Sequence, residues 1–352
     1  MKSLSSLGRK VPQSFSRPSG TPSVVALFPA LKRWATGRRS SGGASPSTKL
    51  GSLSFQARRR CVLATIAIVI ILISLPACAP SHRDRIVIGS KNFTEQLILG
   101  EILAQHIESK THIPVDRRFY LAGTFICQQG ILSGRIDIYP EYTGTALTAI
   151  LKQTPGREPR QVYERVKNEY ASRFHLAVGS PLGFDDTFAI EIRGEDARRL
   201  HLQTISQAAP YTPKWRAGFG YEFMERPDGY KGLVATYNLH FAEPPRIMDL
   251  GLLTRALNDK QVDLIAGNTT DGLIPAFDLF VLDDDRHYFP PYEAVPIVRQ
   301  ETLRLHPEVR AALDDLAGEI SDADMRELNY AVDGKHRDAK EVVAEFLRRK
   351  GL

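Results

Sequence analysis

Cysteine is scarce in this 352-residue chain, which contains only Cys61, Cys78 and Cys127. Cys61 precedes a long apolar run and Cys78 follows it, so Cys127 is alone in the rest of the chain. A domain that begins after residue 78 therefore has no intramolecular disulfide. Its roughly 275 residues must be held together by their own hydrophobic core.

The motifs that identify many enzymes and metal sites are also missing. The chain has no phosphate-binding GxxxxGK[ST] loop, GxSxG elbow, HExxH pair or paired CxxC. His287 stands beside Asp283, Asp284 and Asp285, a pattern more typical of an acidic surface turn than of a metal site. We therefore expect no catalytic activity, no metal and no cofactor.

Acidic residues are absent from positions 1–60, which carry 12 of the 46 Lys and Arg residues. The other 34 basic residues are outnumbered by 40 acidic ones, so the formal charge of +6 separates into +12 for the leader and −6 for the rest. The basic charge thus indicates no nucleic-acid partner. Residues 1–60 are rich in Ser, Gly, Pro and Arg and have no helical or strand period, which predicts a disordered leader.

The apolar run that follows spans 14 residues, 62–75, and is shorter than the roughly 20 that a membrane span needs. Its basic flank and the small residues at its exit are typical of a secretory signal peptide over 61–78. Leu75-Pro76-Ala77-Cys78 resembles a bacterial lipobox, although Pro76 departs from the pattern. The resemblance implies an exported lipoprotein anchored through Cys78 in the periplasm or cell envelope. A soluble secreted form and an uncleaved anchor remain alternatives.

From residue 85 onward, short apolar strands alternate with helices, which predicts an α/β fold with parallel strands. Asn92 followed by Glu95 has the spacing of a capping box and predicts a helix start. The expected strands are 85–90, 115–121, 136–139, 175–178, 215–218, 246–249 and 262–266. The expected helices include 124–132, 143–151, 159–172, 229–237, 252–258 and the tail 307–349.

Two extended segments, 185–192 and 288–298, separate the strand–helix units. We therefore predict a bilobed α/β protein whose lobes are joined by two extended hinge crossings. Lobe 1 is expected over 85–184 plus 293–352, and lobe 2 over 185–292.

Three loops are expected at the carboxyl ends of the first three strands, where α/β folds bind their ligands. Each opens a helix whose free N–H groups favour an anion, and Lys91, Thr143 and Thr145 add donors there. This region suits a carboxylate, with a solvated lysine and plain helix capping as alternatives.

Aromatic residues gather near the same loops and crossings. An aromatic cage binds a quaternary ammonium group by cation–π attraction; packing of the hinge and the core is the alternative. The residues are Tyr139, Tyr142, Phe184, Phe188, Tyr288, Phe289 and Tyr292.

Six segments resemble, in the same order, the glycine betaine/choline-binding proteins of bacterial ABC importers. They are IVIGSKNFTEQ (86–96), GRIDIYPEYTGT (134–145), PLGFDDTFAI (181–190), EFMERPDGY (222–230), TTDGLI (269–274) and FPPYEAVPIVR (289–299). The resemblance covers essentially all of 85–352. It implies a type II periplasmic-binding-protein fold that delivers a small osmolyte to an ABC permease driven by a separate ATPase. We expect a monomer.

The resemblance also implies the aromatic side chains that surround the ligand. Tyr142 and Tyr292 match two walls of the family's cage, and Phe188 stands where Tyr is frequent. Asn268 occupies a position that is commonly Tyr, so one wall is missing.

The groups that hold a ligand carboxylate are implied in the same way. Arg226 and Thr145 match such groups, with Lys91 near another. Glycine betaine, choline or a related quaternary ammonium osmolyte is the expected ligand. A different small polar solute or amino acid, or a role in solute sensing rather than import, remains an alternative.

Overall fold

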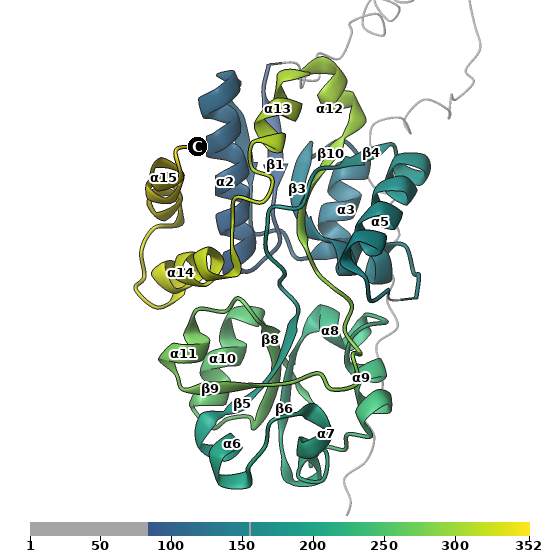
Figure 1. Cartoon of the computed structure of the whole chain (residues 1–352), viewed down its shortest axis with the longest axis vertical. Coiled ribbons are helices and arrows are strands. Elements are labelled where there is room, and N and C mark those ends of the chain that lie inside the picture. The colour runs from purple at the N-terminus through teal and green to yellow at the C-terminus, as the bar shows by residue number, and fades with distance from the viewer. Residues whose placement is uncertain (1–83, 155) are drawn as a thin grey trace, which may run out of the picture. The chain divides into compact units, whose positions relative to one another are not determined.

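The computed structural model describes residues 84–154 and 156–352. The leader, the signal segment and Cys78 lie outside these residues, so the predictions made for them stay predictions. The described part contains two five-stranded sheets with helices packed around them (Figure 1). Among the described helices, none combines the length and the apolar character that crossing a bilayer requires.

The first sheet has the strand order β2-β1-β3-β10-β4. β1 pairs in parallel with β2 and β3, as the alternation of strands and helices predicts. β10 lies antiparallel between β3 and β4. The strands are β1 (Ile86–Gly89), β2 (Val115–Arg118), β3 (Ile138–Tyr142), β4 (Leu176–Val178) and β10 (Ala294–Arg299).

The second sheet repeats this arrangement in the order β7-β6-β8-β5-β9. β6 is parallel to β7 and β8, whereas β5 is antiparallel to β8 and β9. The strands are β5 (Phe188–Arg193), β6 (Ala217–Gly220), β7 (Arg246–Met248), β8 (Leu264–Asn268) and β9 (Leu279–Leu282). The two sheets define lobe 1 and lobe 2.

The antiparallel strand of each sheet is the one that follows a crossing from the other lobe. The sequence predicts these two segments only as extended crossings. In the structure they end in β5 and β10, which run antiparallel to their neighbours because the chain enters each sheet from the other lobe. The crossings run side by side: Asp185 and Glu293 form an antiparallel bridge, and the Leu182 N–H donates to the Ala294 carbonyl at 2.9 Å. The predicted hinge is thus a hydrogen-bonded pair of segments.

The core of lobe 1 is built around helix α2 (Thr94–Thr111). Ile98, Leu99, Ile102 and Leu103 on this helix are fully buried. The sheet covers one side of the helix, and the tail helices pack against the apolar residues that the sheet does not cover. The predicted helical tail consists of α12 (Gln300–Leu305), α13 (Glu308–Asp314), α14 (Asp322–Asp333) and α15 (Ala339–Lys350). The other lobe 1 helices are α3 (Thr124–Leu132), α4 (Thr143–Thr145), the π-helix η1 (Ala146–Ile150) and α5 (Pro159–Phe174).

The capping box predicted at Asn92 is wrong. Helix α2 begins at Thr94, and its N-cap residue, Phe93, makes no side-chain cap. Glu95 turns into the protein, where it accepts hydrogen bonds from Tyr142 and Thr270. Long-range partners for a buried carboxyl group override the local cap, since burial without partners is costly.

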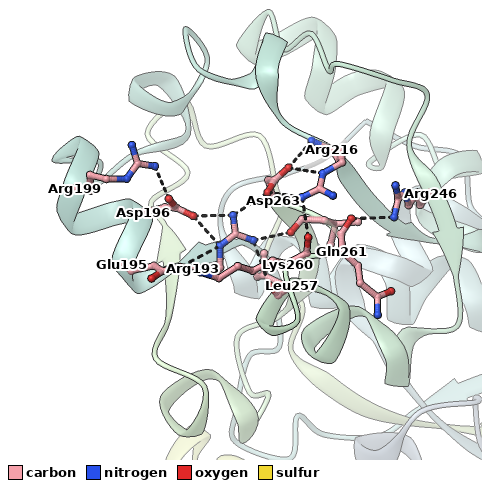
Figure 2. Close-up of polar contacts among 11 residues, drawn as sticks. Arg193, Glu195, Asp196, Arg199, Arg216, Arg246, Leu257, Lys260, Gln261 and Asp263 are labelled. Carbon is pink, nitrogen blue, oxygen red and sulfur yellow. Dashed lines mark hydrogen bonds and ion pairs between the residues drawn. The ribbon is translucent and has the colours of Figure 1, made fainter.

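Lobe 2 is stabilised away from the cleft by a network of arginines around Asp263 (Figure 2). Arg193, at the end of β5, donates to Asp263 at 2.8 Å and to the Val262 carbonyl at 2.7 Å, and Arg216 donates to Asp263 at 2.9 Å. Burial alone would raise the pKa of Asp263, but these donors lower it to about 2. The helices are α6 (Gly194–Leu200), α7 (Ile205–Ala208), the 3₁₀ turn η2 (Thr212–Lys214), α8 (Tyr221–Glu225), α9 (Tyr230–Tyr237), α10 (Leu250–Asn258) and α11 (Leu273–Ala276).

Candidate functional site

All seven side chains selected from the sequence line one cavity that both lobes contribute to. They are Lys91, Tyr142, Thr145, Phe188, Arg226, Asn268 and Tyr292. The three loops expected to meet at the first sheet also line it, through residues 91–93 and 122–124 and through Tyr142 and Thr145. The structure thus brings together groups that are far apart in the sequence.

Strand ends place the aromatic side chains of the cavity. Tyr142 is the last residue of β3, and Tyr292 comes two residues before β10. Phe188 begins β5 and pairs in register with Asn268 at the end of β8. Because the ends of these strands face the cleft, their side chains form adjoining walls of the cavity.

Two pairs of rings form these walls. Tyr142 stacks with Phe93 at 6.5 Å between ring centroids, and Phe188 meets Tyr292 edge to face at 5.6 Å. The Tyr142 hydroxyl donates to Glu95 at 2.6 Å, and the Tyr292 hydroxyl donates to Asp228 at the same distance. Each tyrosine is therefore held by its hydroxyl. Asn268 stands where a further ring was expected from the family pattern.

Lys91 forms a buried ion pair with Glu141. Its Nζ also lies 4.8 Å from the centroid of the Tyr142 ring. Burial raises the pKa of Glu141, and the positive charge of Lys91 opposes that rise. The alternative of a solvated loop lysine is wrong, because Lys91 is 4% exposed.

Arg226 is held by two hydrogen bonds to Asp228, from Nε at 2.9 Å and from Nη2 at 2.5 Å. Its guanidinium carbon lies 5.0 Å from the centroid of the Phe188 ring and 5.9 Å from that of Tyr292. Burial acts to lower the pKa of Arg226, but Asp228 outweighs it and raises the pKa, so the guanidinium stays charged. Both cations of the predicted site therefore carry a carboxylate partner inside the protein.

Two further carboxyl groups line the cavity, Glu222 and Asp186. Glu222, from lobe 2, accepts the Phe125 N–H at the start of α3 at 3.4 Å. One of the three helix ends expected to attract a ligand anion is thus already satisfied by a carboxylate of the protein. The cavity combines aromatic walls and these two carboxyl groups with two cations that Glu141 and Asp228 already neutralise, which favours a positively charged group on the ligand.

The sequence interpretation missed several groups around the cavity, including Phe93, Asp186, Glu222 and Asp228. Phe93 and Asp228 lie inside two of the quoted segments, KNF and ERPDGY, so their position beside Lys91 and Arg226 was the available signal. Asp186 and Glu222 also lie inside quoted segments, PLGFDDTFAI and EFMERPDGY, but no local pattern predicts that Glu222 contacts α3 in the other lobe.

Other residues selected from the sequence serve packing. Tyr139 is fully buried in the core of lobe 1 and donates to Gln128 at 2.9 Å. Cys127 is a buried free thiol whose pKa is raised by burial to about 12, so it is unreactive at neutral pH. Within residues 84–154 and 156–352, no group of three or more His, Cys, Asp or Glu side chains is arranged to hold a metal ion.

Two α/β lobes joined by paired crossings, with a cavity lined by both, define a solute-binding protein with the type II periplasmic-binding-protein fold. Residues 84–349 match the family model described as the substrate binding domain of ABC-type glycine betaine transport system. The chain belongs to this family, whose members bind the substrate for an ABC transport system with a permease and an ATPase. It is a family of transport proteins rather than of enzymes.

Individual relatives agree with this assignment. The chain is 34% identical to the carnitine transport binding protein of Listeria monocytogenes serotype 1/2a (strain 10403S), over 82% of this chain and 94% of that one. It is 32% identical to a glycine-betaine-binding protein of Pseudomonas aeruginosa, over 78% and 91%. The crystal structure of a glycine betaine/carnitine/choline ABC transporter component matches with a TM-score of 0.63 and 34% identity, over 75% of this chain and 98% of that one.

Proposed function

We propose that this protein captures glycine betaine, choline or a related quaternary ammonium osmolyte between its lobes and delivers it to a permease. The observation that carries the proposal is the cavity in which Tyr142, Phe188 and Tyr292 lie beside the carboxyl groups of Asp186 and Glu222, while both cations are already paired with carboxylates of the protein. Trimethylammonium has no hydrogen-bond donor, so ring faces and negative charge are the features that bind it.

The zwitterionic ligands carry a carboxylate as well. We propose that Arg226, Thr145 and Lys91 hold it, which is supported by their positions on the cavity wall. The net attraction is modest, because Asp228 and Glu141 already balance the two cations. Choline has no carboxylate and should depend less on Arg226.

Calorimetric titration tests the aromatic site. We expect the Tyr142→Ala/Tyr292→Ala variant to bind glycine betaine at least about fivefold more weakly than wild type, since each lost ring removes about 0.5–2 kcal/mol. Lys335→Ala is a matched control, because Lys335 contacts the Tyr330 ring outside the residues that line the cavity. Equal affinities for the double variant and wild type would reject the cage.

One observation favours a second candidate ligand class. Asn268 places an amide in the wall where the family pattern has a ring, and an amide can bind a hydroxyl, amine or carboxylate. A small polar solute or an amino acid is therefore the alternative ligand. A sensing role would use the same cavity and differs by the absence of a partner permease.

We propose further that the protein is exported and tethered through a lipid on Cys78, and that it works as a monomer without catalysing a reaction. The lipobox-like Leu75-Pro76-Ala77-Cys78 supports the tether. A Cys78→Ser variant should move from the membrane fraction to the soluble one. The strand membership of the sheets supports lobe boundaries at 85–184 plus 293–352 and at 185–292.

A further inference from the structure

A cluster of buried polar groups joins the two lobes beside the ligand cavity. Glu95 lies on α2 of lobe 1, Thr270 follows β8 of lobe 2, and Asp186 lies on the first crossing. Each of the three residues is at most 6% exposed. Asp186 also lines the cavity, so the cluster connects the ligand site to the contact between the lobes.

The Thr270 hydroxyl bridges the two carboxyl groups. Its Oγ1 lies 2.8 Å from Asp186 Oδ1 and is also hydrogen-bonded to Glu95 Oε2. A threonine hydroxyl has one hydrogen and can donate it to one carboxylate only. The other contact needs a hydrogen that comes from a carboxyl group, so one of the two acids must be protonated.

The remaining partners indicate which acid carries the proton. Glu95 accepts the Tyr142 hydroxyl at 2.6 Å and the Asn329 amide at 3.0 Å, as suits an ionised carboxylate. The Asp186 side chain accepts the Thr270 N–H only at 3.4 Å, and it is hydrogen-bonded to Glu95 as well as to the Thr270 hydroxyl. The hydrogen bonds therefore run from protonated Asp186 to Thr270 and on to Glu95.

The charged groups around the cluster favour this arrangement. The cavity's cations are engaged elsewhere, since Lys91 pairs with Glu141 and Arg226 with Asp228. Burial raises the pKa of Glu95, and burial together with the charge of Glu95 raises the pKa of Asp186 well above its usual range. The other polar and titratable groups nearby are Tyr142 on β3, Asn329 and Asp333 on α14, and Asp271 after β8.

We propose that Asp186, Thr270 and Glu95 form a proton-holding latch, in which closing the lobes over a ligand traps one proton on Asp186. Ligand capture is then coupled to proton uptake. The inference rests on the proposed function, since it needs a ligand bound between the lobes. Opening the cleft separates Glu95 from Thr270 and returns both acids to water, where they are ionised at neutral pH.

The latch makes affinity depend on pH in a defined direction. Between the ordinary carboxyl pKa near 4 and the raised pKa of the closed form, closing takes up a proton. Within that window affinity rises as pH falls, by up to about tenfold per pH unit. Outside the window the latch contributes no pH dependence.

Calorimetric titration with glycine betaine or choline, in buffers of different ionisation enthalpy, counts the protons taken up. Between about pH 5 and pH 7 we expect about one proton per ligand for wild type and none for Asp186→Asn, whose amide cannot titrate. Thr270→Ser keeps the bridging hydroxyl and should keep the uptake, whereas Thr270→Val should lose it. Ligand binding without buffer dependence, or an unchanged proton number in Asp186→Asn, would overturn the latch and leave the proposed function intact.

Failure of every quaternary ammonium ligand to bind would overturn the proposed function instead. The same titration with the small polar solute or amino acid that does bind then tests the latch, because it counts protons taken up on closure whatever the ligand is. Uptake of about one proton by wild type and none by Asp186→Asn would support the latch, and equal proton numbers would overturn it.

Discussion

At the scale of single residues, the cavity wall depends on charges that are neutralised inside the protein. Lys91 and Glu141 are both buried, and in the described part Glu141 Oε2 has no hydrogen-bond partner. The pair is therefore poorly compensated beyond its own attraction. Removing one member would leave the other charge isolated, which costs more than replacing both by apolar groups.

We expect Lys91→Met to lower the free energy of unfolding by about 3–5 kcal/mol at neutral pH. The double variant Lys91→Met/Glu141→Leu should recover most of that loss. Because burial raises the pKa of Glu141, acid pH should protonate it and reduce the effect of the single change. Urea unfolding of wild type, single and double variants measures this. Equal losses in the single and double variants would indicate lost packing instead of an isolated charge.

The residues that sequence motifs could supply are those that line the cavity. Tyr142, Phe188, Arg226 and Tyr292 lie in the segments that resemble the family, and all four line the cavity. Their supporting partners could not be found in this way. Glu95 matched a local capping pattern, yet its partners, such as Thr270, are distant in sequence, and no local rule predicts such contacts.

At the scale of elements, the two crossings show what the hydrophobic pattern of the sequence does not predict. Strand lengths and positions follow from apolar runs, but the direction of β5 and β10 depends on the lobe from which the chain arrives. The sequence therefore predicts two extended segments and leaves their sheet partners open. β3 extends to Tyr142, beyond its expected end at residue 139, where it pairs with β10, and the expected helix 143–151 is a short turn of α-helix followed by a π-helix.

Gly183 gives the first crossing a conformation that side chains rarely adopt, with φ of +119°. A Cβ atom there would lie 2.8 Å from the carbonyl oxygens of Gly318 and Ile320. We expect Gly183→Ala to cost about 2–4 kcal/mol, because backbone strain and overlap add. Gly318→Ala is the control: its φ is +75° with nothing within 4 Å of the Cβ position, so about 1 kcal/mol is expected. Similar urea midpoints for the two variants would contradict the steric argument.

Asp185 makes the stability of the crossings depend on pH. It accepts the Tyr292 N–H at 2.8 Å, and burial, with Glu293 and Asp322 nearby, raises its pKa to about 6. A raised carboxyl pKa means that stability is highest below about pH 4 and falls as pH rises through about 6. Asp185→Asn should therefore become more stable relative to wild type by up to about 3 kcal/mol between these limits. Chemical denaturation across this range measures the difference in unfolding free energy between Asp185→Asn and wild type. A difference that does not change with pH would show that Asp185 titrates as it does in water.

At the scale of the whole molecule, the lobes meet through the paired crossings and through a few polar contacts across the cleft. The Asn329 amide donates to the Thr270 carbonyl at 2.9 Å, and Glu222 accepts the Phe125 N–H. These polar contacts between the lobes are few compared with the contacts inside the hydrophobic cores, and each lobe has a core of its own. A ligand that touches both lobes therefore adds a substantial share of the energy that holds them together.

This division of energy predicts how ligands stabilise the protein. A ligand at one hundred times its Kd should raise the free energy of unfolding by about 2.7 kcal/mol, and a thermal-shift screen detects that gain. We expect gains with glycine betaine, carnitine and choline, and none with glycine, which has the carboxylate of glycine betaine without its methyl groups. Arg226→Met should reduce the gain from glycine betaine more than that from choline, since only the former has a carboxylate. Stabilisation by glycine or another amino acid, with none from the trimethylammonium compounds, would instead assign the cavity to the alternative ligand class that Asn268 favours.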